Sequence, residues 1–305
     1  MKRFTILYVE YLIFFVLKCS GKINIDIKLA SHKTVAAVHF SGADNKLITA
    51  KEINLYNVTD DNLKRGARVE LGRTPDDVFL KNPTPYGDLY QKYKWREVYR
   101  NVHVLSAEID DIINENEVIT VVDYINNTTN NVRKDMRMYR TVEHTMKSLW
   151  SSDGLPMDNI PYKVKVAYYL QHFSYENKWR EINFKTTKIN FGVNSYGFIE
   201  VEPGKSVTVK LLGKRTTVLV KIKYIASLTG QIIANYAREY GKYHFWAPSA
   251  ANIMKAGNLN NEIITTEFIE IKCYTDPSIK VKDTLTGKRI PIKFTYKPFR
   301  GRKHK

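Results

Sequence analysis

The 305-residue chain has little cysteine, and its glycine and proline follow no repeating pattern. It contains 2 Cys, 15 Gly and 10 Pro. Two cysteines cannot build the dense disulfide framework of small secreted scaffolds. The absence of a glycine period, of a sustained heptad and of any repeat of about 20 to 50 residues excludes collagen, coiled coils and solenoids. A chain of this length is therefore expected to be stabilised by a hydrophobic core.

Catalytic and metal-binding signatures are missing as well. The histidines show no HExxH spacing, and no CxxC or GxSxG motif occurs. Gly204-Lys205-Ser206 resembles the end of a phosphate-binding loop, but Ile199 stands where that loop needs an earlier glycine. Three acidic pairs lie where turns are expected, and Asp is common in turns. These acidic pairs are Asp60-Asp61, Asp76-Asp77 and Asp110-Asp111. We therefore expect no catalysis, no metal site and no cofactor.

Positive charge is abundant. The chain has 48 Lys+Arg against 31 Asp+Glu, which gives a net charge of +17. A hydrophobic content of 43% with 12% aromatic residues excludes a disordered chain. The positive field favours acidic glycans, anionic membranes, acidic proteins or nucleic acid as partners.

Residues 1–21 have the pattern of a secretory signal peptide. A basic start, Met1-Lys2-Arg3, precedes the apolar block Tyr11–Leu17, and small residues stand at Cys19 and Gly21. The other interpretation is an uncleaved interfacial or buried segment. Cleavage removes three basic residues and one acidic residue, so the net charge falls to +15. We expect a secreted, extracellular protein, which argues against nucleic acid as its partner.

Cleavage would leave Cys273 as the remaining cysteine. Its alternating surroundings, Phe268–Cys273, favour a thiol buried in a strand, with pairing between chains as the alternative. Three sequons fit a secreted protein and predict glycosylation at Asn57, Asn126 and Asn127.

Apolar and polar residues alternate along most of the chain, which is typical of half-buried strands. The segments Thr141–Trp150 and Gln231–Tyr240 fit a short helix as well as a strand. The aromatic and basic stretch Tyr90–Arg96 could stack nucleic-acid bases, but the outer face of a strand explains it better in a secreted protein. The expected strands are 22–29, 98–105, 118–124, 162–170, 182–191, 207–211, 218–224, 263–271 and 290–296.

The alternation predicts an all-β, mostly antiparallel fold. A Pro-rich link at Lys81–Gly87 separates a β-rich N-terminal lobe, residues 22–100, from a longer β domain, residues 101–292. Residues 293–305 form a basic C-terminal tail without acids. A cationic tail can bind acidic surfaces, and a solvated terminus without a partner is the other interpretation. The candidate binding residues are Lys297, Arg300, Arg302, Lys303 and Lys305.

A longer stretch, Asn126–Tyr236, carries an order of features that points to a known family. Asn126-Asn127-Thr128-Thr129 follows a strand, Gly154 lies in a turn after Trp150, and Glu202-Pro203-Gly204-Lys205 separates two alternating strands. This order resembles the aerolysin-type β-pore-forming superfamily. It is closer to its non-toxin members, spherulin and the insect follicular-epithelium yolk proteins, which Tyr86–Tyr90 and Lys94-Trp95 also resemble.

The resemblance implies an elongated, twisted antiparallel protein in which one amphipathic hairpin can, in the toxins, be released to build a transmembrane barrel. Here the matching region is Tyr162–Val193. It departs from the toxins' pattern because it contains charged residues such as Arg180 and Lys188. The candidate membrane-facing residues are Val164, Val166, Tyr168, Leu170, Ile189 and Phe191.

These observations leave three hypotheses. The first is a secreted, non-enzymatic protein with a storage, egg-covering or extracellular-assembly role. The second is a pore-forming, membrane-active effector that oligomerises through the hairpin. The third is a binder of acidic glycans through the basic tail.

Overall fold

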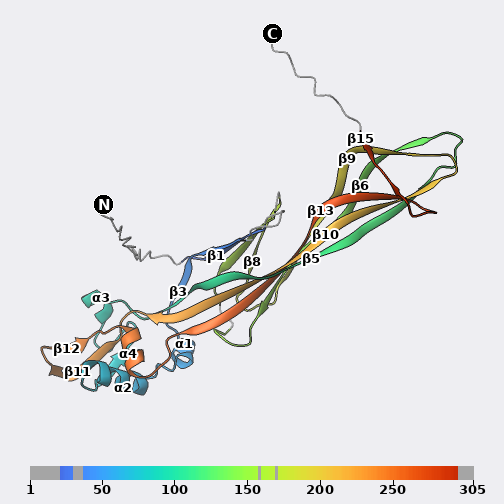
Figure 1. The fold of residues 1–305 in the computed structure, drawn as a ribbon. Coiled ribbons are helices and arrows are strands. Elements are labelled where there is room, and N and C mark those ends of the chain that lie inside the picture. The colour runs from blue at the N-terminus through green and yellow to red at the C-terminus, as the bar shows by residue number, and fades with distance from the viewer. Residues whose placement is uncertain (1–20, 30–36, 157–158, 169–170, 295–305) are drawn as a thin grey trace, which may run out of the picture.

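The computed structural model describes residues 21–29, 37–156, 159–168 and 171–294, and it shows an elongated molecule (Figure 1). Long strands run from a small end that carries the helices to a distal end of strands and turns. We call these the helical end and the distal end. The predicted all-β fold is confirmed, because antiparallel sheets make up most of the described chain.

The main sheet has the strand order β15-β9-β6-β13-β10-β5-β3, with β14 paired to β13. Within it, β10 pairs antiparallel with β5 on one side and with β13 on the other. At about 3.3 Å per residue, a 24-residue strand spans about 80 Å. The strands are β3 (Ala43–Leu47), β5 (Tyr99–Ile125), β6 (Val132–Trp150), β9 (Phe184–Val201), β10 (Ser206–Thr229), β13 (Ile263–Asp283), β14 (Arg289–Ile290) and β15 (Lys293–Phe294).

Some expected strands are parts of longer ones. The segments 98–105 and 118–124 both lie in β5, and 207–211 and 218–224 both lie in β10. Between the two β5 segments, residues 110–116 are exposed, so apolar alternation is interrupted while pairing with β10 continues. Backbone pairing does not depend on burial of side chains, which is why the pattern alone divided these strands.

A second sheet covers the middle of the main sheet. Its order is β2-β1-β7-β8, and β1 and β7 run parallel. Alternate residues of β1 and β7 point inward and pack against β5, β10 and β13 in one hydrophobic cluster. The strands are β1 (Ile23–Leu29), β2 (Ala37–Ser41), β7 (Tyr162–Tyr168) and β8 (Gln171–Asn177).

Helices gather at one end, around a small sheet of order β12-β11-β4. Gly66 allows α2 to approach α4 closely, because a Cβ there would lie 2.3 Å from the carbonyl oxygen of Ile253. Residues 48–98 and 228–263 share the core of this end. Its elements are α1 (Ala50–Leu55), α2 (Asp60–Leu71), β4 (Asp77–Phe79), α3 (Leu89–Tyr93), β11 (Ile233–Tyr240), β12 (Tyr243–Trp246) and α4 (Ala250–Ala256).

The structure adds detail to two expectations. The N-terminal lobe contains the helices α1, α2 and α3 beside the strands β1 to β4. The buried residues of α2, Leu63, Gly66 and Ala67, have helical spacing, but only Leu63 among them is a large apolar residue, so the helical pattern is weak in the sequence. The two ambiguous segments are strands: Thr141–Trp150 ends β6, and Ile233–Tyr240 is β11. The predicted boundary near residue 100 stays a prediction.

At the distal end, β6 and β9 separate from the rest of the main sheet. β6 pairs with β13 only from Thr145 to Trp150, whereas its pairing with β9 continues to Val132. Beyond that point the β6–β9 layer packs against β10 and β13 through its own cluster, which includes Met138, Phe191 and Leu211. The result is a small two-layered sandwich.

A buried ion-pair cluster joins the helical end to the main sheet. Arg100 of β5 is fully buried and pairs with Asp44 of β3, and its Nε lies 3.4 Å from Oε1 of Glu52 in α1. Glu52 also closes the capping box of α1, where its carboxylate accepts a hydrogen bond from the Thr49 backbone N–H at 2.7 Å.

Arg100→Ala is expected to lower the free energy of unfolding by about 3–5 kcal/mol, because it leaves carboxylates uncompensated in a buried site. Urea denaturation followed by circular dichroism measures the change. Lys64→Ala is the control: its ammonium pairs with the exposed Asp60 at 2.7 Å, and the loss should be within about 0.5 kcal/mol. A loss below about 1 kcal/mol for Arg100→Ala would contradict this assignment.

Candidate functional site

The hairpin of β7 and β8 lies on the outside of the main sheet. The strands pair antiparallel from Tyr162 opposite Asn177 to Tyr168 opposite Gln171. Val164 and Val166 are buried against the main sheet, and Lys165 on the opposite face of β7 is exposed. β7 is therefore amphipathic, with an apolar face turned inward.

The predicted hairpin, Tyr162–Val193, is not one unit. It contains β7, β8 and the first part of β9, and β9 belongs to the main sheet. The chain leaves β8 through residues 178–183, where Trp179 is fully buried and Arg180 has a left-handed backbone with φ of 60°. This turn directs the chain back to the main sheet.

The candidate membrane-facing residues therefore fall into two groups. Val164 and Val166 lie together on β7, whereas Ile189 and Phe191 pack in the distal cluster on β9. Tyr168 ends β7, and Leu170 lies outside the described residues.

A buried carboxyl group ties the hairpin to the main sheet. Glu267 of β13 is fully buried, and its Oε2 accepts a hydrogen bond from the Tyr224 hydroxyl of β10 at 2.6 Å. Its Oε1 accepts a hydrogen bond from the Tyr162 hydroxyl of β7 at 3.0 Å. Ser148 of β6 donates a further hydrogen bond. Glu267 thus joins side chains from three other strands of two sheets.

Four aromatic rings surround this carboxyl. Trp150 and Trp179 join Tyr162 and Tyr224, with ring centroids between 4.8 and 6.4 Å apart. The Trp179 indole N–H donates to the Leu155 carbonyl oxygen at 3.4 Å. We call Glu267 and these four rings the aromatic box. The aromatic box lies at the beginning of β7, next to the segment that connects β6 to β7.

The helical end carries a surface of partly exposed aromatic rings. Tyr93 stacks on Trp95 with centroids 4.6 Å apart, and Phe245 contacts both Tyr93 and Tyr86. Tyr86, Tyr93 and the more distant Tyr243 are between 41% and 60% exposed. We call the set the aromatic surface: Tyr86, Tyr93, Trp95, Tyr243, Phe245 and Trp246.

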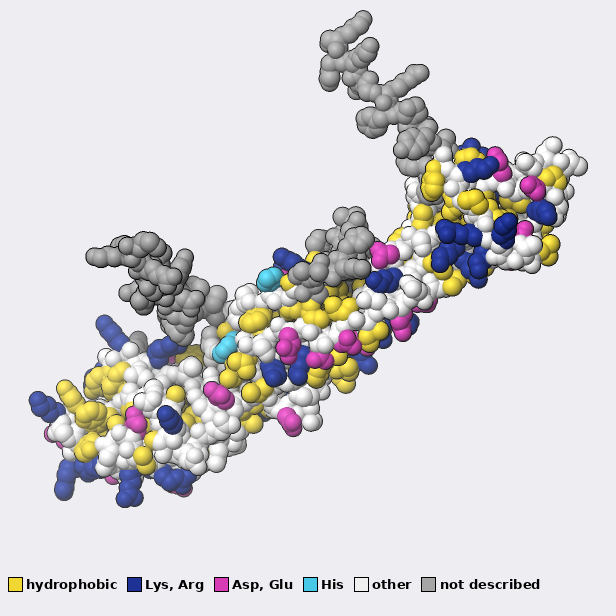
Figure 2. Space-filling model, in the orientation of Figure 1, with side chains coloured by type: hydrophobic (Ala, Val, Ile, Leu, Met, Phe, Trp, Pro, Cys, Tyr) yellow, Lys and Arg dark blue, Asp and Glu magenta, His cyan; other side chains and the backbone are white. Residues whose placement is uncertain are grey.

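Cationic side chains accompany the aromatic surface. Lys92 lies 5.2 Å from the centroid of Tyr93, and Arg73 lies over Tyr236 and Tyr240 at 5.5 and 5.8 Å. Figure 2 shows dark blue and yellow side chains side by side on this end. Such a surface suits ligands that combine flat or apolar faces with negative charge.

Sequence reasoning missed this surface. The stretch Tyr90–Arg96 is not a strand; it spans most of α3 and the residues that follow it. Tyr93 meets Phe245, which lies in a segment distant along the chain, so no local motif joins the two rings. The sequence feature that could have indicated the aromatic surface is the density of aromatic and basic residues in Tyr236–Trp246.

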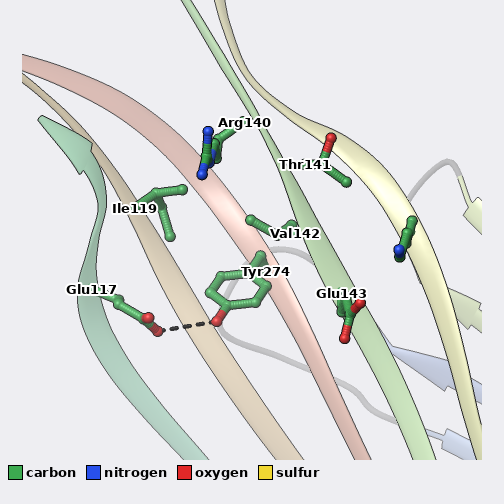
Figure 3. A pocket seen from close by; sticks show the side chains of 8 residues that line it. Glu117, Ile119, Arg140, Thr141, Val142, Glu143 and Tyr274 are labelled. Atoms are coloured by element: carbon green, nitrogen blue, oxygen red, sulfur yellow. Dashed lines mark hydrogen bonds between the residues drawn. The ribbon is translucent and has the colours of Figure 1, made fainter. Parts of the chain in front are cut away.

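A polar pocket of about 460 Å³ opens where β6 separates from β13 (Figure 3). The Tyr274 hydroxyl donates to Glu117 at 3.2 Å, and burial raises the pKa of Tyr274. The pocket contains both carboxylates and cationic groups, so it favours neither sign of charge. Its lining residues are Glu117, Ile119, Arg140, Thr141, Val142, Glu143, Lys188 and Tyr274.

The three predicted glycosylation sites have different surroundings. Asn57 and Asn127 are exposed and stay predictions. Asn126 is 3% exposed; its amide donates to the carbonyl oxygens of Asn130 and Val201, and its Oδ1 accepts from Thr128. In the folded chain this amide is therefore buried and hydrogen-bonded, unlike those of Asn57 and Asn127.

The predicted burial of Cys273 is confirmed. Its thiol lies in β13, 3.8 Å from the carbonyl oxygen of Thr216, and burial raises its pKa to about 12. The candidate anion-binding residues, from Lys297 to Lys305, lie outside the described residues. In the described part of the chain no group of acidic, His or Cys side chains could hold a metal ion, and no helix is long and apolar enough to cross a bilayer.

Known toxins are similar to this chain. U-megalopygitoxin(8)-Mc8 of Megalopyge crispata is 28% identical over 81% of this chain and 87% of its own length. U-megalopygitoxin(8)-Mo15 of Megalopyge opercularis is 25% identical over 90% of each chain. No protein-family model matches.

One solved structure supports the fold. The parasporin-2 toxin of Bacillus thuringiensis, described as recognising cancer cells, matches with a TM-score of 0.54 and 14% identity, over 83% of this chain and 100% of its own. The predicted aerolysin type of fold is confirmed. The relatives named above are toxins; none of them is a spherulin or a yolk protein, and a storage or egg-covering role has no support.

Glycosylation of the secreted protein is expected at Asn57 and Asn127 and not at the buried Asn126. Asn127→Gln should remove one of two glycans. The sequon at Asn126 remains in this variant, but the Asn126 amide is hydrogen-bonded to the carbonyl oxygens of Asn130 and Val201. Intact mass before and after enzymatic removal of N-glycans measures the occupancy. Asn57→Gln serves as the matched control, and a glycan peptide containing modified Asn126 would refute the assignment.

Proposed function

We propose that this protein is an extracellular, non-enzymatic, toxin-like protein that damages membranes by releasing the β7–β8 hairpin in an assembly of several copies. The observation that carries the proposal is β7, an amphipathic strand of this hairpin that packs on a sheet whose own strands are paired without it. Toxin relatives that cover most of the chain support the same conclusion.

The hairpin can leave without breaking the ladder of the main sheet. β10 is paired on both sides by β5 and β13, so removal of β7 exposes apolar side chains but no backbone groups of these strands. In a membrane, Val164 and Val166 would exchange the core for lipid, and Lys165 would face water. A β-strand needs about 9–11 residues to cross a bilayer, so residues flanking the seven-residue β7 must join the crossing.

The helical end is suited to recognise the target. Half-exposed Tyr and Trp rings provide flat apolar faces with polar edges, and nearby Lys and Arg side chains add positive charge. A cell surface presents both sugars and anionic headgroups to such a surface. Binding of acidic glycans by residues 297–305 stays a separate prediction.

A disulfide between β1 and β7 tests release of the hairpin. Asp26 and Lys165 are register partners on the outward face of the two strands. Neighbouring strands have Cα separations within the about 4.4–6.8 Å range that disulfides accept. The oxidised Asp26→Cys/Lys165→Cys protein should release no dye from phosphatidylcholine–phosphatidylserine vesicles, and reduction should restore release.

The matched control ties β1 to β2 through Asp26→Cys/His39→Cys, a register pair that leaves β7 free. It should release dye in both redox states. Equal release from the oxidised and reduced β1–β7 pair would contradict release of the hairpin. Absence of dye release and of an oligomer in every variant, before and after limited proteolysis, would reject the pore.

Target recognition has its own test. Tyr93→Ala and Tyr243→Ala together should weaken binding to susceptible cells by about thirtyfold or more, since aromatic anchors at interfaces cost about 1–2 kcal/mol each when truncated. Flow cytometry of labelled protein measures binding, and thermal unfolding confirms an intact fold. Leu285→Ala, at an 84% exposed apolar residue of the distal end, should leave binding unchanged. Equal loss in both proteins would contradict the assignment.

A further inference from the structure

Glu267 is a carboxyl group in the core without a cationic partner. The polar groups that face it are Tyr224 from β10, Ser148 from β6 and Tyr162 from β7. No charged neighbour contributes to its pKa within the described part of the chain. Arg180, which follows Trp179, directs its guanidinium at carbonyl oxygens instead; these belong to Ser151, Ser152, Asp153 and Leu155.

Burial therefore controls the protonation of Glu267. Desolvation raises its pKa to about 7, although the hydrogen bonds from Tyr224, Ser148 and Tyr162 lower it in part. The neutral carboxyl is the more stable form inside the aromatic box, because a carboxylate there would lose its hydration without gaining a cationic partner. The change between the two forms falls in the neutral pH range.

The strands that meet at Glu267 differ in how firmly they are held. β10 and β6 are joined to β13 by backbone hydrogen bonds on either side of Glu267, through the register pairs Ile222–Glu267 and Glu267–Trp150. β7 belongs to the other sheet and reaches Glu267 through a side chain, Tyr162. β7 is hydrogen-bonded through its backbone to β1 and β8 but not to the main sheet. Separation of β7 from Glu267 therefore breaks no backbone hydrogen bond of the main sheet, and it admits water to the carboxyl.

We propose that Glu267 is a proton-controlled latch for the β7–β8 hairpin: the packed hairpin encloses a neutral carboxyl, and loss of the proton leaves a carboxylate without a cation in the core, which favours detachment. The inference rests on the proposed function for its purpose, because it names what regulates release of the hairpin. Its physical test does not require a membrane.

The direction of the pH effect follows from linkage. A detached hairpin exposes Glu267 to water, where its pKa returns to an ordinary value near 4.5. The closed form binds the proton more tightly, so acid stabilises it, and this stabilisation is lost as pH rises through about 7. The equilibrium constant for opening should increase about tenfold between pH 6 and 8 and level off above pH 8.

Hydrogen exchange of the β7 amides, Tyr162–Tyr168, measures this opening. After correction for the intrinsic rate, wild-type protection factors should fall about tenfold from pH 6 to pH 8. In Glu267→Gln, which has the same shape but no titrating proton, they should change less than about twofold. Glu270→Gln is the matched control: Glu270 is half-buried on the same strand, 3.0 Å from Lys272, and this variant should respond like the wild type.

Two outcomes of this experiment would overturn the latch. One is a wild-type β7 protection factor that does not change between pH 6 and pH 8, and the other is a tenfold change in Glu267→Gln as well. If Glu267→Gln does not fold, Tyr162→Phe replaces it. The Tyr162 hydrogen bond favours the carboxylate, so its loss should raise the pKa of Glu267 and move the fall in β7 protection to higher pH; an unchanged midpoint of that fall contradicts the latch.

Dye release from the same vesicles separates the latch from the pore. A pH response at β7 without dye release at any pH supports the latch and contradicts the proposed function. Dye release that rises equally with pH in the wild type and in Glu267→Gln supports the pore and contradicts the latch.

Discussion

The pairing of β10 on both sides is the constraint on which the molecule depends. From Val207 to Ala226 its backbone bonds to β13, and from Ser206 to Thr229 it bonds to β5. This ladder fixes the distance between the helical and distal ends, and it provides the surface on which the second sheet packs. Because the ladder satisfies its own backbone groups, other parts of the fold can be held by side chains alone.

The main sheet is held by backbone pairing and the second sheet is held on it by side chains, so the two parts differ in stability. The β7–β8 hairpin has a ladder to β1 but meets the main sheet through apolar packing and the aromatic box. Apolar packing carries no direction, so the same face that fits a protein core also fits lipid. The Tyr162–Glu267 hydrogen bond has no counterpart in lipid, so it is made by the packed hairpin and lost by a released one.

The sequence predicted the architecture better than the sites. Period-two alternation located the strands because half of each strand faces a core, but it divided β5 where both faces are exposed. It missed α2, whose buried residues Leu63, Gly66 and Ala67 have helical spacing but include only one large apolar side chain. These errors arise where few large apolar residues mark the buried face.

The sites depended on contacts between distant segments, which alternation alone does not give. Glu267 shows what was readable: it shares the inward phase of Ile269, Ile271 and Cys273, so alternation places a carboxyl in the core. Its partners Tyr162 and Tyr224 could not be inferred, since the packing of the second sheet brings them together. Asn126 likewise matches a sequon, and only its contacts show that it is structural.

The ladder of β10 also constrains how such a protein can diverge. Adding or removing one residue within β10 would reverse the inward and outward side chains beyond that point, against two neighbours at once. The existing irregularities, near Leu211, Leu219 and Lys223, show that such changes need a compensating bulge. Length differences among related proteins should therefore accumulate in the connections, and the helical end can acquire new surfaces while the long strands keep their length.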